Sequence, residues 1–195
     1  MPESWIVVAV AAVLGFFIGS INPATIIART RHADLRQGSG NPGATNAGRV
    51  LGVRWGVMVG LLDVLKGFLP TFLALFFFDR FTAYVVGLAT VLGHVLSPFL
   101  RGRGGKGVAT SFGAVLAVFP WFALGMLIFF GLMLWRTRWV AGSSLAAAGL
   151  LMFYAGLAPL PDPVLAGRVW GICIALLVII RHRDNVRRWF QRRLA

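Results

Sequence analysis

Six long apolar segments constrain the fold of this chain more than any other feature. They lie near residues 5–28, 51–77, 81–100, 111–135, 139–158 and 164–180. Each is long enough to cross a hydrocarbon core of about 30 Å as an α-helix, which satisfies its own backbone polar groups there. Hydrophobic residues make up 58% of the 195 and charged residues 13%, which excludes an ordinary soluble domain. The sequence therefore predicts one all-α, polytopic membrane domain over residues 1–195.

Two further features narrow this class of protein. The N-terminal apolar run has neither a basic leading region nor a clear cleavage site, so we expect it to be retained as a span. The single cysteine, Cys173, lies inside an apolar run, where a buried free thiol is the expected state. We expect neither a metal ion nor a cofactor.

The formal net charge of +13 raises the question of a nucleic-acid partner. The basic residues lie where apolar segments end, however, as the positive-inside rule predicts for cytoplasmic loops. We therefore expect no nucleic acid and a lipid bilayer as the surroundings. The arginines expected to anchor the chain at anionic lipid are Arg29, Arg31, Arg187, Arg188, Arg192 and Arg193.

The distribution of charge does not agree with six crossings. The basic loops at 31–49 and 101–110 and the tail from Arg181 should face the cytoplasm together, yet three crossings after Thr110 place the tail outside. A hairpin over Ser111–Trp135, broken near Pro120, resolves this conflict and also makes Arg136 and Arg138 cytoplasmic. The prediction is then seven transmembrane helices. Two of them, of about a dozen residues each, are too short to span and should be half-length and packed against other protein.

The first candidate site is the cationic, glycine-rich stretch GSGNPGATNAGR, Gly38–Arg49. Glycine lets backbone N–H groups approach an oxyanion closely, and Arg49 adds a fixed positive charge. The alternative is a tight turn in which Asn or Thr caps the next helix. The other candidate contacts to a phosphate in this stretch are Gly38, Ser39, Gly40, Asn41, Gly43, Thr45 and Asn46.

The second candidate is GRGGKGVAT, Gly102–Thr110, which fails as a Walker A motif because Gly107 stands where Ser or Thr should follow Lys106. Lys106 precedes a helix expected to start near Val108, where N-terminal N–H groups and the helix dipole favour an anion. A snorkelling lysine and glycines that serve close helix packing are the alternatives. The remaining candidate contacts are Gly104, Gly105, Gly107 and Thr110.

The third cluster is RHRDN, Arg181–Asn185, followed by Arg188. On one helix, His182 and Asn185 would share a face and could contact a polar substrate together; an interfacial histidine with a satisfied ring is the alternative. Ser143 and Ser144 could donate hydrogen bonds to phosphate or cap their helix.

Asp63, Lys66 and His94 are ionisable residues that lie within the predicted spans. Asp63 and Lys66 are three residues apart, so they are expected to neutralise each other or to shape the site. His94 is expected to be structural, bonded to a backbone or hydroxyl group.

Taken together, these motifs resemble the PlsY family, the acyl-phosphate-dependent glycerol-3-phosphate acyltransferases of bacteria. The motifs are GSGNPGATNAGR, DVLKG, GHVLSPFLRGRGGKGVAT, the serine pair and RHRDNVRR, between residues 20 and 189. The resemblance implies seven helices, with all motifs on the cytoplasmic side of the bacterial plasma membrane. It implies a catalytic set of Ser39, Arg49, Lys106, His182 and Asn185. We also expect a monomer. Two departures are Arg103, where the family usually has lysine, and a C-terminus, QRRLA, without the usual acidic residue.

The implied reaction moves a fatty acyl group from acyl phosphate to the 1-hydroxyl of sn-glycerol 3-phosphate, giving lysophosphatidic acid and phosphate. Acyl phosphate carries a good leaving group, so no enzyme nucleophile is required, and no GxSxG motif is present. The hydroxyl proton could pass to a substrate phosphate or to His182. The alternative function is a transporter or binding protein for a phosphorylated solute, against which stands the lack of an inverted repeat.

Overall fold

The computed structural model describes residues 4–194, with side chains up to Gln191, and every regular element in that range is a helix. The chain forms two compact units, Met1–Pro120 and Trp121–Ala195, called here the first and the second unit. The first unit holds α1 (Trp5–Ser20), α2 (Pro23–Thr30), η1 (Leu35–Gln37), α3 (Ala44–Leu51), α4 (Val53–Phe77), α5 (Arg80–Leu96), η2 (Pro98–Leu100) and α6 (Val108–Val118). Then follow α7 (Pro120–Thr137), α8 (Val140–Leu157), α9 (Val164–Arg181) and α10 (Arg183–Leu194). Whether the chain is one domain, as expected, stays a prediction.

The all-α, multi-pass prediction is confirmed in its main feature. Among the described residues, six helical stretches are long and apolar enough to cross a membrane. They are Trp5–Thr30, Val53–Phe77, Arg80–Leu100, Pro120–Thr137, Val140–Leu157 and Val164–Arg181. A seventh apolar helix, α6, is shorter, so the count of seven crossings stays a prediction.

The expected hairpin of two half-length helices is only half correct. The chain does break at Phe119, next to Pro120, and α6 has 11 residues and packs against α4 and α5. However, α7 has 18 residues and is itself long enough to span, so the half-length prediction is wrong for this helix. Pro120 is the first residue of α7, where its missing N–H is tolerated, and the helix then continues without a breaker to Thr137.

The N-terminal run, expected as one helix, is broken into α1 and α2. Pro23 has no N–H to continue the ladder of α1, and Ile21 is extended, with ψ 125°. Asn22 caps α2 by accepting a hydrogen bond from the N–H of Thr25 at 2.8 Å. An Asn-Pro pair inside an apolar run is the signal that could have revealed this break.

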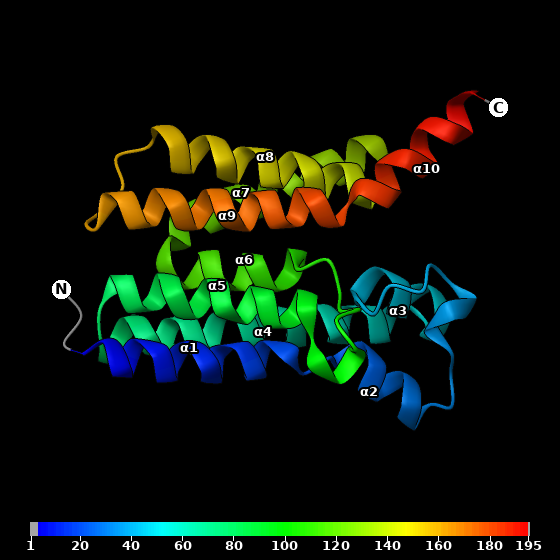
Figure 1. The fold of residues 1–195 in the computed structure, drawn as a ribbon. Helices are drawn as coiled ribbons and strands as arrows, with labels where there is room; N and C mark the ends of the chain where they lie inside the picture. Colours follow the sequence, from blue (N-terminus) through cyan, green and yellow to red (C-terminus); the bar gives the residue numbers. More distant parts are fainter. Residues whose placement is uncertain (1–3, 195) are drawn as a thin grey trace. The chain divides into compact units, whose positions relative to one another are not determined.

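Glycines allow the helices of the first unit to pack closely. Figure 1 shows α1, α4, α5 and α6 side by side. Gly19 and Gly93 lie at the contact of α1 with α5, and Gly67 and Gly113 at that of α4 with α6. A β-carbon at any of the four would overlap backbone of the facing helix. Such reciprocal pairs of small residues are typical of helices packed within a membrane.

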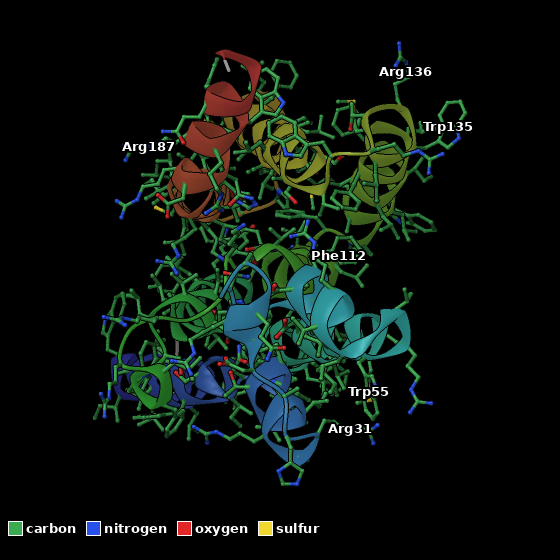
Figure 2. All side chains as sticks on the ribbon, turned by 90° about the vertical axis from the view of Figure 1, so that its right-hand side faces the viewer. Arg31, Trp55, Phe112, Trp135, Arg136 and Arg187 are labelled. Carbon is green, nitrogen blue, oxygen red and sulfur yellow. The ribbon has the colours of Figure 1, made fainter. Side chains whose placement is uncertain are left out.

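In the second unit, α8 packs along α9, where a β-carbon at Gly171 would meet the Ala155 side chain. The rings of Phe122 and Tyr154 are stacked with centroids 3.8 Å apart, which joins α7 to α8. Figure 2 shows Arg136 and Arg187 extending away from this unit, as an anchoring role for Arg187 predicts.

Candidate active site

The two glycine-rich motifs lie at the same end of the first unit (Figure 1). The first follows α2 and leads into α3, and the second follows α5 and leads into α6. An apolar cluster of Ala24, Ile27, Ala47 and Val59 is buried between α2, α3 and α4 and supports the first motif. At the same end, Arg31 and Arg54 lie 5.1 and 4.9 Å from the Trp55 ring centroid; Figure 2 labels Arg31 and Trp55.

Only the first half of the first motif is a loop, and the second half is helical. The motif is irregular up to Gly43, and α3 begins at Ala44, so Thr45, Asn46 and Arg49 are helical. Gly43 occupies the N-cap position and no side chain caps the helix, contrary to the alternative of a capping Asn or Thr. Thr45 and Arg49 are exposed one turn apart and therefore share a face of α3.

Asn46 holds the loop in shape. Its Oδ1 accepts a hydrogen bond from the N–H of Ser39 at 2.6 Å, and its Nδ2 donates to the carbonyl of Leu35 at 2.8 Å. The side chain is 1% exposed, and a β-carbon at Gly38 would overlap its amide. Gly40 has φ +73°, a conformation that favours glycine. The loop is therefore wrapped around Asn46, with Ser39 on its exposed side.

An exposed ion pair flanks this loop. Asp34 and Arg36 lie 2.9 Å apart, between Oδ2 and a guanidinium nitrogen. Hydrogen bonding from Arg36 holds the pKa of the Asp34 carboxyl below its usual value, so this carboxyl is ionised at neutral pH.

The second motif folds back on the end of α5. The N–H groups of Gly104 and Gly105 donate to the carbonyls of Val95 and His94, each at 3.1 Å. A β-carbon at either glycine would overlap His94. These two glycines therefore serve close packing, which is the alternative to direct contact with a phosphate. Gly107, with φ +81°, precedes α6, which starts at Val108 as expected.

Lys106 is half-buried at the head of α6, and no side chain caps this helix. The N–H groups in the first turn of α6 point toward the end of the helix where Lys106 lies, and this arrangement attracts anions. Thr110, a predicted contact, is fully buried, and its hydroxyl finds no hydrogen-bond partner among the described residues. Ser111, which the sequence motifs did not indicate, is also buried, and its hydroxyl has no hydrogen-bond partner among the described residues either.

The third cluster lies at a junction of two helices. Since α9 ends at Arg181 and α10 begins at Arg183, the expectation that His182 and Asn185 occupy one helix is wrong. A turn links them, because the N–H of Asn185 donates to the carbonyl of His182 at 2.9 Å. His182 is 2% exposed, with Nδ1 2.8 Å from the carbonyl of Val178. Arg188 donates to Asn185 Oδ1 at 3.3 Å.

The serine pair lies in the first turns of α8, and both serines are buried. The hydroxyl of Ser143 donates to the carbonyl of Trp139 at 3.1 Å, and that of Ser144 donates to Val140 at 2.9 Å. These bonds are not the expected caps, which would accept from backbone N–H groups. The stack of Trp139 on Trp189, with centroids 5.2 Å apart, brings this end of α8 to α10.

The structure thus gathers the two loops in the first unit, and the serine pair and third cluster in the second. That all of them form a single site stays a prediction.

Inside the first unit, the predicted ion pair is present. Asp63 Oδ1 lies 2.8 Å from Lys66 Nζ, and both residues are buried. His94 Nδ1 lies 3.4 Å from the same Asp63 oxygen. The imidazole therefore faces a carboxylate, not the backbone or hydroxyl partner expected for it.

Residues 9–192 match the sequence profile of a family described as glycerol-3-phosphate acyltransferase. The chain belongs to this family. A glycerol-3-phosphate acyltransferase of Aquifex aeolicus is 43% identical over 183 residues, covering 90% of this chain and 92% of the relative. One of Geobacter sulfurreducens is 42% identical over 179 residues, covering 90% of each.

Solved structures agree with this family assignment. The crystal structure of PlsY, an integral membrane glycerol 3-phosphate acyltransferase, in its glycerol 3-phosphate form has a TM-score of 0.87 at 39% identity. The structural alignment covers 95% of this chain and 93% of the PlsY chain. The lysophosphatidic acid form gives 0.86 at 38% identity. The predictions of the PlsY family and of an integral membrane acyltransferase of phospholipid synthesis are confirmed, and the transporter alternative finds no support.

Proposed function

We propose that this acyltransferase uses acyl phosphate as its donor and the 1-hydroxyl of sn-glycerol 3-phosphate as its acceptor. The products are lysophosphatidic acid and inorganic phosphate. The relatives' names and the ligand forms of the solved PlsY structures support the acceptor and the product. We further propose that the enzyme works as a monomer on the cytoplasmic face of the bacterial plasma membrane.

The observation that carries the proposal is the presence of two cationic glycine-rich motifs at one end of the first unit. Arg49 is exposed on α3, and Lys106 precedes the uncapped N-terminus of α6. Both proposed substrates bear a phosphate: Arg49 offers a charge at the first motif, and Lys106 lies beside the first-turn N–H groups of α6 at the second. An acyl chain needs apolar surroundings, and a hollow lined by Leu61, Leu65, Phe68 and Leu116 lies between α4 and α6.

The reaction is a direct acyl transfer. The 1-hydroxyl oxygen attacks the carbonyl carbon of acyl phosphate, the new ester C–O bond forms, and the bond from this carbon to the phosphate oxygen breaks. Phosphate leaves with the electron pair of that bond. Negative charge builds first on the carbonyl oxygen and then on the phosphate, so preorganised cations near both atoms lower the barrier.

We assign Arg49 and Lys106 to phosphate binding and charge stabilisation, and Ser39 to orientation of the substrate. The loop N–H groups expected to share that role are engaged at Gly38, Ser39 and Gly40, which donate to Leu35 and Asn46. His182 and Asn185 are assigned to glycerol 3-phosphate. The supporting contacts proposed are Gly38, Gly40, Asn41, Gly43, Thr45, Asn46, Gly104, Gly105, Gly107, Thr110, Ser143, Ser144 and Arg188. Among these, the packing of Asn46, Gly104 and Gly105 favours a role in holding the loops.

The hydroxyl proton has two possible acceptors. A phosphate oxygen of a bound substrate can take it directly, which needs no protein base, and this is the route we favour. His182 is the competing base. A carbonyl oxygen can only accept, so Nδ1 beside Val178 carries the proton, and a neutral ring then has its lone pair on Nε2.

Purified enzyme incubated with palmitoyl phosphate and labelled glycerol 3-phosphate tests the proposed function. We expect phosphate release in step with formation of labelled lysophosphatidic acid. Release of phosphate without labelled lipid, or binding of glycerol 3-phosphate without turnover, would contradict the proposal.

A further inference from the structure

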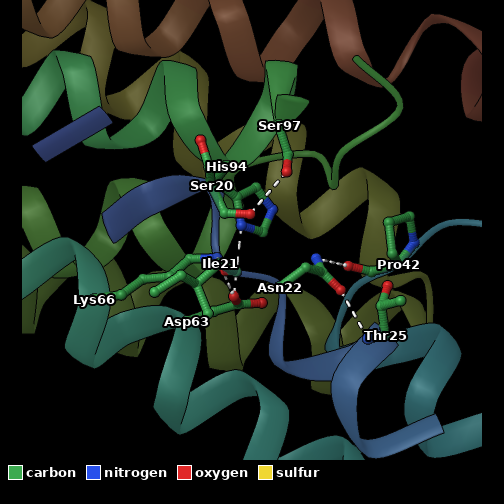
Figure 3. A network of polar contacts seen from close by, with 9 residues as sticks. All are labelled: Ser20, Ile21, Asn22, Thr25, Pro42, Asp63, Lys66, His94 and Ser97. Carbon is green, nitrogen blue, oxygen red and sulfur yellow. Dashed lines mark hydrogen bonds and ion pairs between the residues drawn. The ribbon is translucent and has the colours of Figure 1, made fainter. Parts of the chain in front are cut away.

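The break between α1 and α2 is a meeting point for distant parts of the first unit (Figure 3). In a continuous helix the carbonyl of Ile21 would accept from the N–H of Thr25. Here Thr25 donates to the Asn22 side chain instead. The carbonyls of Ser20 and Ile21 therefore need other donors, because an unsatisfied polar group within a membrane is destabilising.

Both glycine-rich motifs are attached to this break. The hydroxyl of Ser97, which begins the segment leading to the second motif, donates to the carbonyl of Ser20 at 2.7 Å. The amide Nδ2 of Asn22 donates to the carbonyl of Pro42, inside the first motif, at 2.9 Å. Ser20 and Asn22, which lie on either side of Ile21 at the break, thus bond to two loops that are about 60 residues apart in sequence. Such distant segments are brought together only by tertiary contacts.

The buried ion pair supplies the remaining donor. Lys66 Nζ donates to the carbonyl of Ile21 at 2.7 Å while it pairs with Asp63 at 2.8 Å. Asp63 in turn faces His94 Nδ1 at 3.4 Å. The other edge of the His94 ring lies beneath Gly105, the residue before Lys106. A line of contacts therefore runs from the α1–α2 break through α4 and α5 to the second motif.

Stability alone gives little reason for this arrangement. Asp63 is 2% exposed and Lys66 9%, so both charges lie out of solvent. The loss of hydration offsets most of the attraction in such a pair, and well-packed apolar residues often serve as well or better. What apolar residues could not supply is the hydrogen bond from Lys66 to the carbonyl of Ile21 and the contact of Asp63 with Nδ1 of His94.

We propose that Asp63 and Lys66 are positioning residues that fix the second glycine-rich motif relative to the first, through His94 and the α1–α2 break. They do not touch substrate; they set the distance between the loop that carries Lys106 and the one that leads to Arg49. Charged groups must be held to within about an ångström to be catalytically effective. The inference rests on the proposed roles of Arg49 and Lys106 in binding phosphate.

The first test measures the loops directly and does not depend on activity. Spin labels are attached at the exposed positions Gln37→Cys and Arg103→Cys in a Cys173→Ala background. We expect a single narrow distance distribution in this parent, and a broadened or shifted one after Lys66→Met or Asp63→Asn. Thr71→Val is the matched control, because Thr71 is buried on the same helix and its hydroxyl donates to the carbonyl of Gly67 within that helix. An unchanged distribution in both charge variants would overturn the inference.

The second test separates positioning from folding. Each single variant leaves one buried charge unpaired and is expected to lower Tm, whereas Asp63→Leu combined with Lys66→Met removes both charges. We expect the double variant to recover Tm toward the parent while kcat stays at least tenfold lower. Recovery of kcat together with Tm would show a purely structural pair. If the parent itself fails to make lysophosphatidic acid, the proposed function fails, and the label distances still decide the positioning role.

Discussion

The imidazole of His94 lies directly beneath Gly105, so closely that a β-carbon on the glycine would overlap its Nε2 atom. The backbone of Gly105 is not left-handed, so alanine is excluded there by space and not by conformation. Since Gly105 immediately precedes Lys106, this contact determines how the second motif leaves α5. The same ring faces Asp63 on its other side, which limits how far it can move.

Gly105→Ala is expected to lower both stability and activity. Forcing a methyl group into a packed site typically destabilises by about 1–3 kcal/mol, which corresponds to several degrees of Tm. We expect turnover to fall by at least about tenfold, because Lys106 shifts with the loop. Thermal unfolding in detergent and initial rates measure the two effects.

Gly131→Ala is the control for this substitution, because nothing lies within 4 Å of a β-carbon at Gly131 in α7. It should leave Tm and rate close to the parent. An unchanged Tm for Gly105→Ala would contradict the packing described here.

Arg49→Ala and Lys106→Ala should each lower turnover by about 10²- to 10³-fold, the usual effect of losing one preorganised charge-stabilising group. The expression level and the Tm should stay close to those of the parent, because Arg49 is exposed and Lys106 is half-buried. Arg36→Ala is the matched control, because Arg36 is an exposed arginine in η1, next to the first motif, whose ion-pair partner is Asp34. Near-normal activity of either variant would contradict the assignment of that residue to phosphate binding. Loss of folded protein would indicate a structural role.

The donor should be acyl phosphate and not a thioester, and no acyl-enzyme should accumulate. Cationic groups favour a leaving group that is itself an anion, and the sequence contains no general-base motif of thioester-using acyltransferases. Mass spectrometry of enzyme quenched with donor alone should show unmodified Ser39 and Cys173. An acyl adduct that acylates glycerol 3-phosphate, or equal rates with acyl coenzyme A, would refute direct transfer.

Thr137 should lie on the cytoplasmic side of the membrane, together with Arg136 and Arg138. In a Cys173→Ala background, Thr137→Cys should resist an impermeant thiol reagent added to intact cells. Pro161→Cys is the control, because residue 161 is exposed beyond the other end of α8 and should react. Labelling of Thr137→Cys from outside would contradict the predicted orientation.

The sequence by itself determined the membrane class, the break near Pro120, the start of α6 at Val108 and the pairing of Asp63 with Lys66. These features depend on local or compositional properties: apolar length, a missing N–H at proline, and the spacing of three residues on a helix. The motifs also identified the family. The same reasoning misjudged the length of α7, because a proline that breaks one helix can equally begin the next.

Only the tertiary structure decided what the buried polar groups do. Asn46 is bonded within its own loop, His94 faces a carboxylate, and Lys66 donates to a carbonyl 45 residues away. The partners of His94 and Lys66 cannot be derived from sequence spacing, because each contact joins segments that become neighbours only when the helices pack. The bonds of Asn46 depend on how its loop is wound. The glycines show the same limit: a glycine in a motif permits a close approach, but only the packed structure shows that the neighbour of Gly105 is His94.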